Sequence, residues 1–90
     1  MTIDDFNLKW EKYLSPGHYG MDIEDPLAIN YLDEKFELEI KKNPSFNYSQ
    51  IKLKFGMCRV YAETPNFKIW QDEIDQLLNN THPTFWPTES

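Results

Sequence analysis

The sequence predicts an α+β domain in which a small antiparallel β-hairpin packs against three helices, in the order α-α-β-β-α. Three segments carry apolar residues at spacings of three and four, the stripe of an amphipathic helix. Between the second and third of these, residues 49–62 alternate apolar and polar side chains on either side of one glycine. A lone hairpin is marginal in water, so we expect its apolar face to pack on the helices. Its other face stays exposed or is covered by something else.

The first predicted helix follows Thr2, and Asp5 takes the acid position of a capping box. Its apolar stripe is Ile3, Phe6, Trp10, Tyr13 and Leu14. The turn signal Ser15-Pro16-Gly17 ends it.

Residues 15–25 connect the first two helices. Tyr19, Met21 and Ile23 alternate with other residue types, which allows a short strand, although two glycines weaken that reading. We expect Tyr19 to pack under the domain rather than to lie at an exposed tip with His18.

The second helix has clear local signals at both ends. Asp25 is placed as the N-cap and Pro26 at the first helical position, where the missing N–H costs nothing. Asn43-Pro44 ends the helix. Its buried stripe is Ile29, Leu32, Phe36 and Ile40.

The hairpin of residues 49–62 is predicted with Gly56-Met57 as a two-residue type II′ turn. That turn sets three pairs on the buried face: Phe55 with Cys58, Leu53 with Val60, and Ile51 with Ala62. On the opposite face it pairs Lys54 with Arg59, Lys52 with Tyr61, and Gln50 with Glu63. A slip of one residue would mix the two faces, so the pattern supports the register.

The last helix starts after Thr64-Pro65-Asn66 and closes at Asn79-Asn80. Its stripe is Phe67, Trp70, Ile74, Leu77 and Leu78. We therefore expect one compact domain over residues 1–80 and a C-terminal tail over residues 81–90. Two prolines forbid a helix through this tail. We expect Trp86, next to Phe85, to pack back on the domain.

The composition of the chain argues against several classes of function. The chain has 90 residues, enough for one domain, and carries 9 Lys and Arg against 15 Asp and Glu, a net charge of -6. This balance argues against nucleic acid as a general partner, because phosphate contacts need a cationic surface. No apolar run is long enough to span a membrane, and the N-terminus lacks a signal peptide. The single cysteine fits a reducing compartment, so we expect a cytoplasmic protein without a membrane partner.

No residue pattern points to a cofactor, a metal site or catalysis. His18 and His82 are far apart in the chain, and no Cys or His pair has zinc-ligand spacing. Cys58 is predicted to face the core, where a thiol behaves as a small apolar group. We therefore expect a protein that is not an enzyme.

The distribution of charge gives the candidate binding residues. Residues 46–62 contain Lys52, Lys54 and Arg59 and no acid, whereas residues 22–39 contain seven acids and one lysine. With Tyr61, these cations could stack on a ligand and hold a carboxylate or phosphate. Two simpler explanations stay open. The cations could be solvated residues that discourage strand pairing, or Lys54 and Arg59 could pair with acids of the second helix.

The segment from Gln50 to Phe55 and Gly56, followed by Arg59, Val60 and Tyr61, resembles a signature of small bacterial and phage-encoded proteins of uncharacterised function. Their pattern is Gln, Ile or Val, Lys, any residue, Lys, Phe, Gly, two residues, Arg, any residue, Tyr. The resemblance implies the hairpin and a bacterial or phage setting, and it implies no activity. Those relatives tend to carry Gly-Leu where this chain has Met57-Cys58, so the turn here can differ.

Small size, acidity and abundant aromatics favour a non-catalytic protein-interaction module, an adaptor or inhibitor that could be associated with a phage or mobile element. Its partner is then another protein. The alternative is a binder of a small anionic ligand or a nucleic acid, which would use the basic hairpin face with Tyr61 as a stacking platform.

Overall fold

The computed structural model describes residues 1–81 of the chain. Its elements are the helix α1 (Ile3–Lys9), the 3-10 turn η1 (Glu11–Tyr13), the strand β1 (Gly20–Met21), the helix α2 (Pro26–Lys42), the strands β2 (Tyr48–Lys54) and β3 (Met57–Ala62), and the helix α3 (Phe67–Thr81). The α+β class, the hairpin and its place between the second and third helices are as predicted. The sheet has one strand more than the predicted hairpin. The expectation for Trp86 lies outside the described residues.

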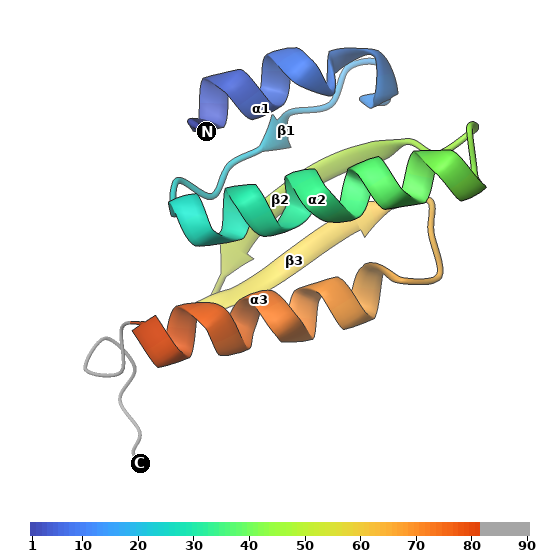
Figure 1. The fold of residues 1–90 in the computed structure, drawn as a ribbon. Coiled ribbons are helices and arrows are strands. Elements are labelled where there is room, and N and C mark those ends of the chain that lie inside the picture. Colours follow the sequence, from blue (N-terminus) through green and yellow to red (C-terminus); the bar gives the residue numbers. More distant parts are fainter. Residues whose placement is uncertain (82–90) are drawn as a thin grey trace.

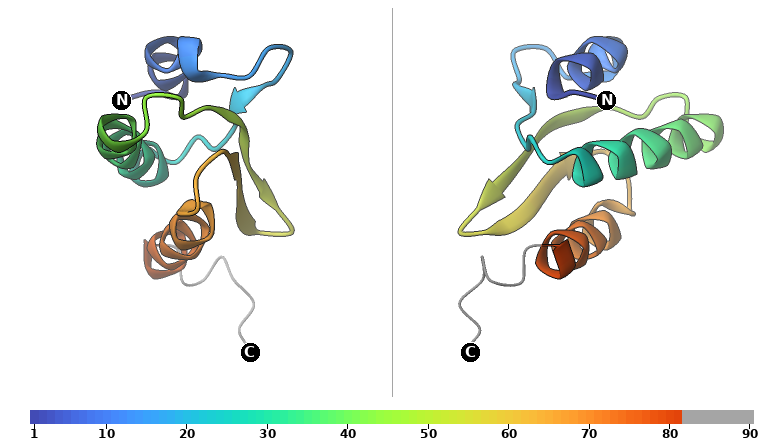
Figure 2. Two further views of the ribbon diagram at one scale, coloured as in Figure 1. Left: turned by 90° about the vertical axis from the view of Figure 1, so that its right-hand side faces the viewer. Right: turned by 60° about the vertical axis from the view of Figure 1, so that its left-hand side comes forward.

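The sheet is mixed and has the strand order β1-β2-β3. β1 is parallel to β2, with Gly20 paired to Gln50 and Met21 to Ile51, and β2 is antiparallel to β3. Figure 1 shows α2 and α3 in front of the sheet with α1 beside them, and the side view in Figure 2 shows the helices on one side of it. The molecule therefore has a helix layer and a sheet layer, and one sheet face points away from the helices.

The first helix is shorter than its apolar stripe predicts. The capping box of Thr2 and Asp5 is formed, but α1 ends at Lys9, and η1 follows it. The reason lies in the sheet: the Ser15 N–H donates to the Tyr48 carbonyl over 2.8 Å, and Leu14 forms an isolated bridge with Tyr48. The chain must be extended at Leu14 to reach β2, so the helix cannot continue to that residue.

The predicted hairpin register is wrong by two residues. The pairs are Leu53 with Cys58, Ile51 with Val60, and Lys52 with Arg59, and the turn consists of Phe55 and Gly56. Both turn residues have positive φ, 55° and 76°, the pattern of a type I′ turn rather than type II′. A slip of two residues keeps every side chain on its face, so the alternation alone could not distinguish the two registers. Phe55 leaves the predicted core and becomes exposed.

A register irregularity between Tyr48 and Gln50 changes the pairing at the other end of the hairpin. Tyr48 and Ile51 are both fully buried although they are three residues apart, which a regular strand would place on opposite faces. The irregularity turns Tyr48 into the core opposite Ala62.

The core is centred on the Phe36 ring of α2. Five aromatic rings lie with centroids 4.8 to 5.6 Å from it: Phe6, Trp10, Phe46, Tyr48 and Trp70. They come from α1 and the residue that follows it, the α2–β2 connection, β2 and α3, so one side chain joins the three helices to the sheet. The Asp25 cap of α2 forms as predicted, with the Asp25 carboxylate accepting from the Leu27 N–H.

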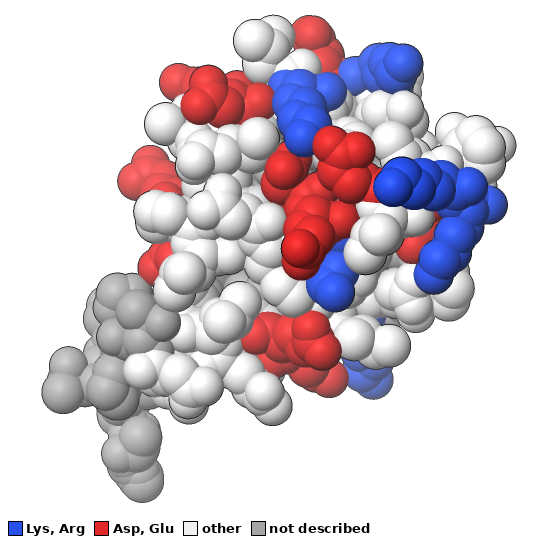
Figure 3. All heavy atoms as spheres, in the orientation of Figure 1, with Lys and Arg blue, Asp and Glu red and all other residues white. Residues whose placement is uncertain are grey.

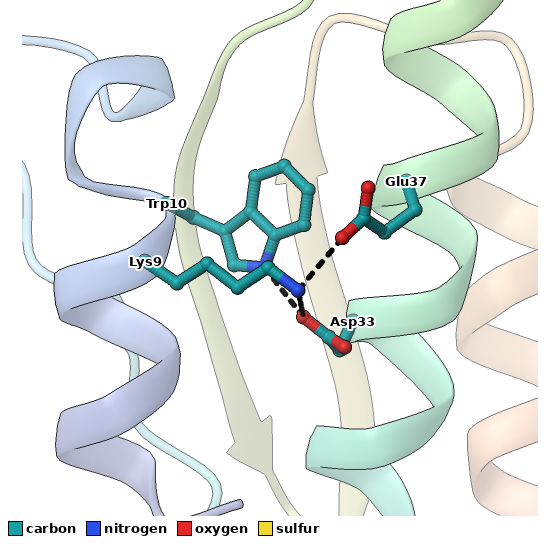
Figure 4. A network of polar contacts seen from close by, with 4 residues as sticks. All are labelled: Lys9, Trp10, Asp33 and Glu37. Carbon is teal, nitrogen blue, oxygen red and sulfur yellow. Dashed lines mark hydrogen bonds and ion pairs between the residues drawn. The ribbon is translucent and has the colours of Figure 1, made fainter.

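A polar network fixes α1 on α2. The Lys9 ammonium lies 2.9 Å from Asp33 Oδ1 and 2.7 Å from Glu37 Oε2, and the Trp10 indole N–H donates to Asp33 over 3.0 Å (Figure 4). These hydrogen bonds to Glu37 and Asp33 raise the pKa of Lys9. Lys9 and two of the α2 acids are therefore neutralised within the helix layer.

Helix side chains bond the backbone of both outer strands. On β1, the Asn7 amide accepts from the Met21 N–H over 2.8 Å and donates to the Met21 carbonyl over 3.2 Å. On β3, Asp75 accepts from the Cys58 N–H and Gln71 from the Val60 N–H, over 2.6 and 2.9 Å. These bonds occupy groups that would otherwise be open to a further strand. The free surface of the sheet is therefore its face rather than these edges.

Candidate functional site

The sheet face that points away from the helices is the candidate site, and we call it the open sheet face. It consists of the alternate residues Gln50, Lys52, Lys54, Met57, Arg59 and Tyr61. Lys54, Met57 and Tyr61 are exposed, and the other three are partly exposed. All four predicted binding residues therefore share this face, as the alternation indicated.

Lys52 and Arg59 lie directly opposite each other in the hairpin. Like charges in that position are destabilising. Within residues 1–81 the ion pairs involve Lys9 alone, so neither cation is paired with a carboxylate. The suggestion that Lys54 and Arg59 pair with acids of α2 is thus wrong, because α2 lies on the other face of the sheet (Figure 2).

Protection against strand pairing explains these cations poorly. Lys52 lies on the central strand, and β3, which carries Arg59, already has backbone groups bonded by Gln71 and Asp75. On the helix side, acidic side chains are spread over the surface and lie beside several lysines (Figure 3). The helices and η1 together carry ten acids and six lysines, whereas the open sheet face carries three cations and no acid, so the two layers differ in net charge.

Tyr61 marks the other chemical feature of the open sheet face. The Lys52 ammonium lies 6.0 Å from the centre of its ring. A shallow hollow of ≈ 290 Å³ beside Tyr61 is lined by His18, Ser49, Gln50 and Lys52. Three of these lining residues, His18, Ser49 and Gln50, were absent from the predicted site. The parallel pairing of Gly20 with Gln50 brings His18 to this hollow. That pairing is not local, so no local sequence pattern predicts it.

Two expectations about individual residues need correction. Tyr19 is exposed and does not pack under the domain, so the loop before β1 presents both His18 and Tyr19 to solvent. Lys54 pairs with Met57 at the turn rather than with Arg59, and its ammonium lies 5.9 Å from the Phe55 ring centre. Lys54 thus belongs to the hairpin end of the open sheet face, away from the hollow.

Cys58 faces the core, as predicted, and is fully buried. Burial, and to a lesser extent the Asp75 charge, raises the pKa of its thiol to about 12, although Arg59 opposes this. Burial also raises the pKa of Asp75, against the opposing effect of the bond from the Cys58 N–H. A thiol with a raised pKa and no access to solvent is a poor nucleophile at neutral pH.

We therefore expect Cys58 to react with iodoacetamide roughly a thousandfold more slowly in the native protein than in denaturing urea at about pH 8. A thiol with a pKa of about 12, rather than its ordinary value of 9.0, holds that much less thiolate at this pH. The free energy of unfolding also depends on the protonation of the Cys58 thiol. Between pH 9 and 12 the unfolded thiol loses its proton while the folded one keeps it, so stability is lost as the pH rises through this window. Native and denatured rates within tenfold of each other would contradict the burial of Cys58.

A second hollow lies between α2 and α3, where its lining includes Tyr31, Glu39 and Asn66. Four of its polar residues bond one another: Asn66 donates to the buried Glu39 over 3.1 Å, and Tyr31 donates to Glu73. These bonds hold the start of α3 on α2. Among residues 1–81, no three His, Cys, Asp or Glu side chains are grouped so as to hold a metal ion. No helix in the same part is both long and apolar enough to cross a bilayer.

Comparison of the chain with family models, with curated proteins and with solved structures gives no match. The resemblance of residues 50–61 to small bacterial and phage proteins therefore remains a prediction.

Proposed function

We propose that this protein is a non-catalytic interaction module that binds an acidic surface of another protein through its open sheet face. The observation that carries the proposal is the cross-strand pair of Lys52 and Arg59, which costs stability and forms no ion pair in residues 1–81. Carboxylates of a partner would convert this repulsion into attraction. Arg59 can bind a carboxylate in a bidentate manner, and Tyr61 next to it adds contact area.

The shape of the site also suits a protein. The open sheet face is a surface of two paired strands with shallow hollows, and an extended, nearly flat surface is what protein interfaces usually bury. Arg and Tyr are enriched in the cores of such interfaces. The acidic helix layer on the opposite side would orient the approach of an acidic partner toward the sheet.

The test is retention of a partner from a lysate of the source cells at moderate salt. We expect the Lys52→Glu/Arg59→Glu variant to lose the partner, with an affinity about a hundredfold weaker once that partner is purified, because two attractive contacts become repulsive. The matched control is Lys12→Glu/Lys41→Glu, which makes the same charge change on exposed residues of η1 and α2. Equal loss in both variants would point to net charge alone and would refute the proposed surface.

A second candidate function is binding of a small anionic ligand in the hollow beside Tyr61. The observation that favours it is that His18, Ser49 and Lys52 line one hollow together with Tyr61. Titration with a nucleoside monophosphate tests it. Saturable binding that Lys52→Glu abolishes and Lys12→Glu leaves unchanged would support this function over the first.

A further inference from the structure

The tip of the hairpin carries three exposed apolar side chains, Leu53, Phe55 and Met57, which we call the apolar tip. Phe55 has 91% of its surface exposed, the largest fraction among the exposed large apolar residues of the described chain. Leu53 and Met57 are exposed to 43% and 46%. The tip projects beyond the helices in the right-hand view of Figure 2. Within residues 1–81, other side chains cover almost none of the Phe55 surface.

The backbone conformation at position 55 does not favour a phenylalanine either. Its φ of 55° lies in the left-handed region, which is unfavourable for a residue with a bulky side chain. Type I′ turns strongly prefer Asn, Asp or Gly at this position. The chain therefore places a large apolar residue where both solvation and backbone conformation favour a small polar one. Residues that break a local rule in this way are concentrated at functional positions.

We infer that Phe55 is an anchor that inserts into an apolar pocket of a partner protein, and that the rim of this pocket carries carboxylates. The inference rests on the proposed function and names the contact that gives it affinity. The Lys54 ammonium lies 5.9 Å from the Phe55 ring centre, and Lys52 and Arg59 form the second pair beyond Lys54 and Met57 along the strands. A pocket that takes the ring thus meets Lys54 first and the Lys52 and Arg59 pair further along the hairpin, and acidic side chains at its rim would neutralise these cations. Exposed aromatic residues that fill such pockets dominate the energy of many interfaces.

A second copy of this chain does not fit as the occupant. A buried aromatic side chain contributes roughly 150–250 Å², and Leu53 and Met57 are already about half covered. Two tips packed together would bury well below the ~1,200 Å² of a stable interface. They would also bring two sets of Lys52, Lys54 and Arg59 together. The occupant that we propose is therefore a pocket of a different protein rather than a second copy of this chain.

The test uses Phe55→Asn in the full chain. Because Asn tolerates the left-handed region, we expect the thermal midpoint of the Phe55→Asn variant to rise by about 4–8 °C. This is the shift that a gain of about 1 kcal/mol in stability produces in a domain of this size. A photoreactive phenylalanine analogue at position 55 identifies the partner in source cells, and the same analogue at Leu8, exposed to 74% on α1, is the control. The purified partner is then titrated with each variant. We expect Phe55→Asn to bind it about a hundredfold more weakly, as for a central anchor, and Leu8→Asn to bind like the parent chain.

Each of the following outcomes would contradict the proposed role of Phe55 as an anchor. A lower thermal midpoint for Phe55→Asn would mean that this chain itself packs against Phe55. Retention of phosphatidylserine vesicles through Phe55, without a protein crosslink, would assign the tip to a lipid surface. If Lys52→Glu/Arg59→Glu loses the partner while Phe55→Asn binds it normally, the proposed function stands and the anchor fails. If both variants bind normally, both fail.

Discussion

Replacement of Phe36 by alanine is expected to remove about 3–5 kcal/mol from the free energy of unfolding, the usual cost of deleting a fully buried aromatic side chain. The loss is at the upper end here because five rings from different parts of the fold lie against Phe36 and cannot all collapse into the cavity. A domain of this size has roughly 5–15 kcal/mol in total, so the variant is close to unfolding.

The measurement is urea denaturation followed by circular dichroism. The control is Leu38→Ala on the same helix, where the side chain is exposed and the expected change is within about 0.5 kcal/mol. A Phe36→Ala loss as small as that of Leu38→Ala would contradict the arrangement of the core around Phe36.

Gly20→Ala is expected to cost about 3 kcal/mol, from two sources. The first is backbone strain, because Gly20 has a φ of 80° and an L-residue there costs about 1–2 kcal/mol. The second is steric: an added Cβ would lie 2.6 Å from Asn7 Oδ1, the acceptor of the Met21 N–H bond. Displacement of Asn7 leaves that partly buried N–H unsatisfied, at a further cost of about 1–3 kcal/mol.

Gly17→Ala separates the two sources. Gly17 has the same φ of 80°, but no atom lies within 4 Å of an added Cβ. We therefore expect this variant to lose only the strain component in the same denaturation experiment. Equal losses at Gly17 and Gly20 would show that the bonds from Asn7 to the backbone of Met21 contribute nothing.

The parts of the fold that depend on neighbouring residues were predictable from the sequence. Asp25 and Pro26 define the start of α2, and Thr2 and Asp5 the start of α1, because caps are local interactions. The end of α1 was not predictable, since it is set by the bond from Ser15 to Tyr48, more than thirty residues away. β1 escaped firm prediction for the same reason, as its parallel pairing with β2 is not local.

The candidate site shows the same division. Alternation placed Lys52, Arg59 and Tyr61 on one face, and this remains true in either register because the slip is two residues. The direct opposition of Lys52 and Arg59 depends on the register and was missed. The exposure of Phe55 was missed too, because general turn preferences disfavour phenylalanine at the position that it occupies.

The open sheet face and the apolar tip belong to one hairpin, and both carry features that reduce stability. A cross-strand pair of cations without an ion pair in residues 1–81 and a phenylalanine in the left-handed region both carry a cost in stability. The helix layer, by contrast, pairs Lys9 with Asp33 and Glu37 and buries its aromatic rings. This contrast within one small domain is the basis for placing the interaction surface on the hairpin.

The most direct test of that placement is covalent footprinting of the surface lysines, with and without the purified partner. Acetylation of Lys52 and Lys54 is expected to slow by roughly tenfold in the complex, because an interface excludes water and reagent from its centre. Lys12 and Lys41, on η1 and α2, are expected to react at the same rate in both states. Protection of Lys12 and Lys41, with Lys52 and Lys54 as reactive as in the free protein, would contradict the assignment of the open sheet face.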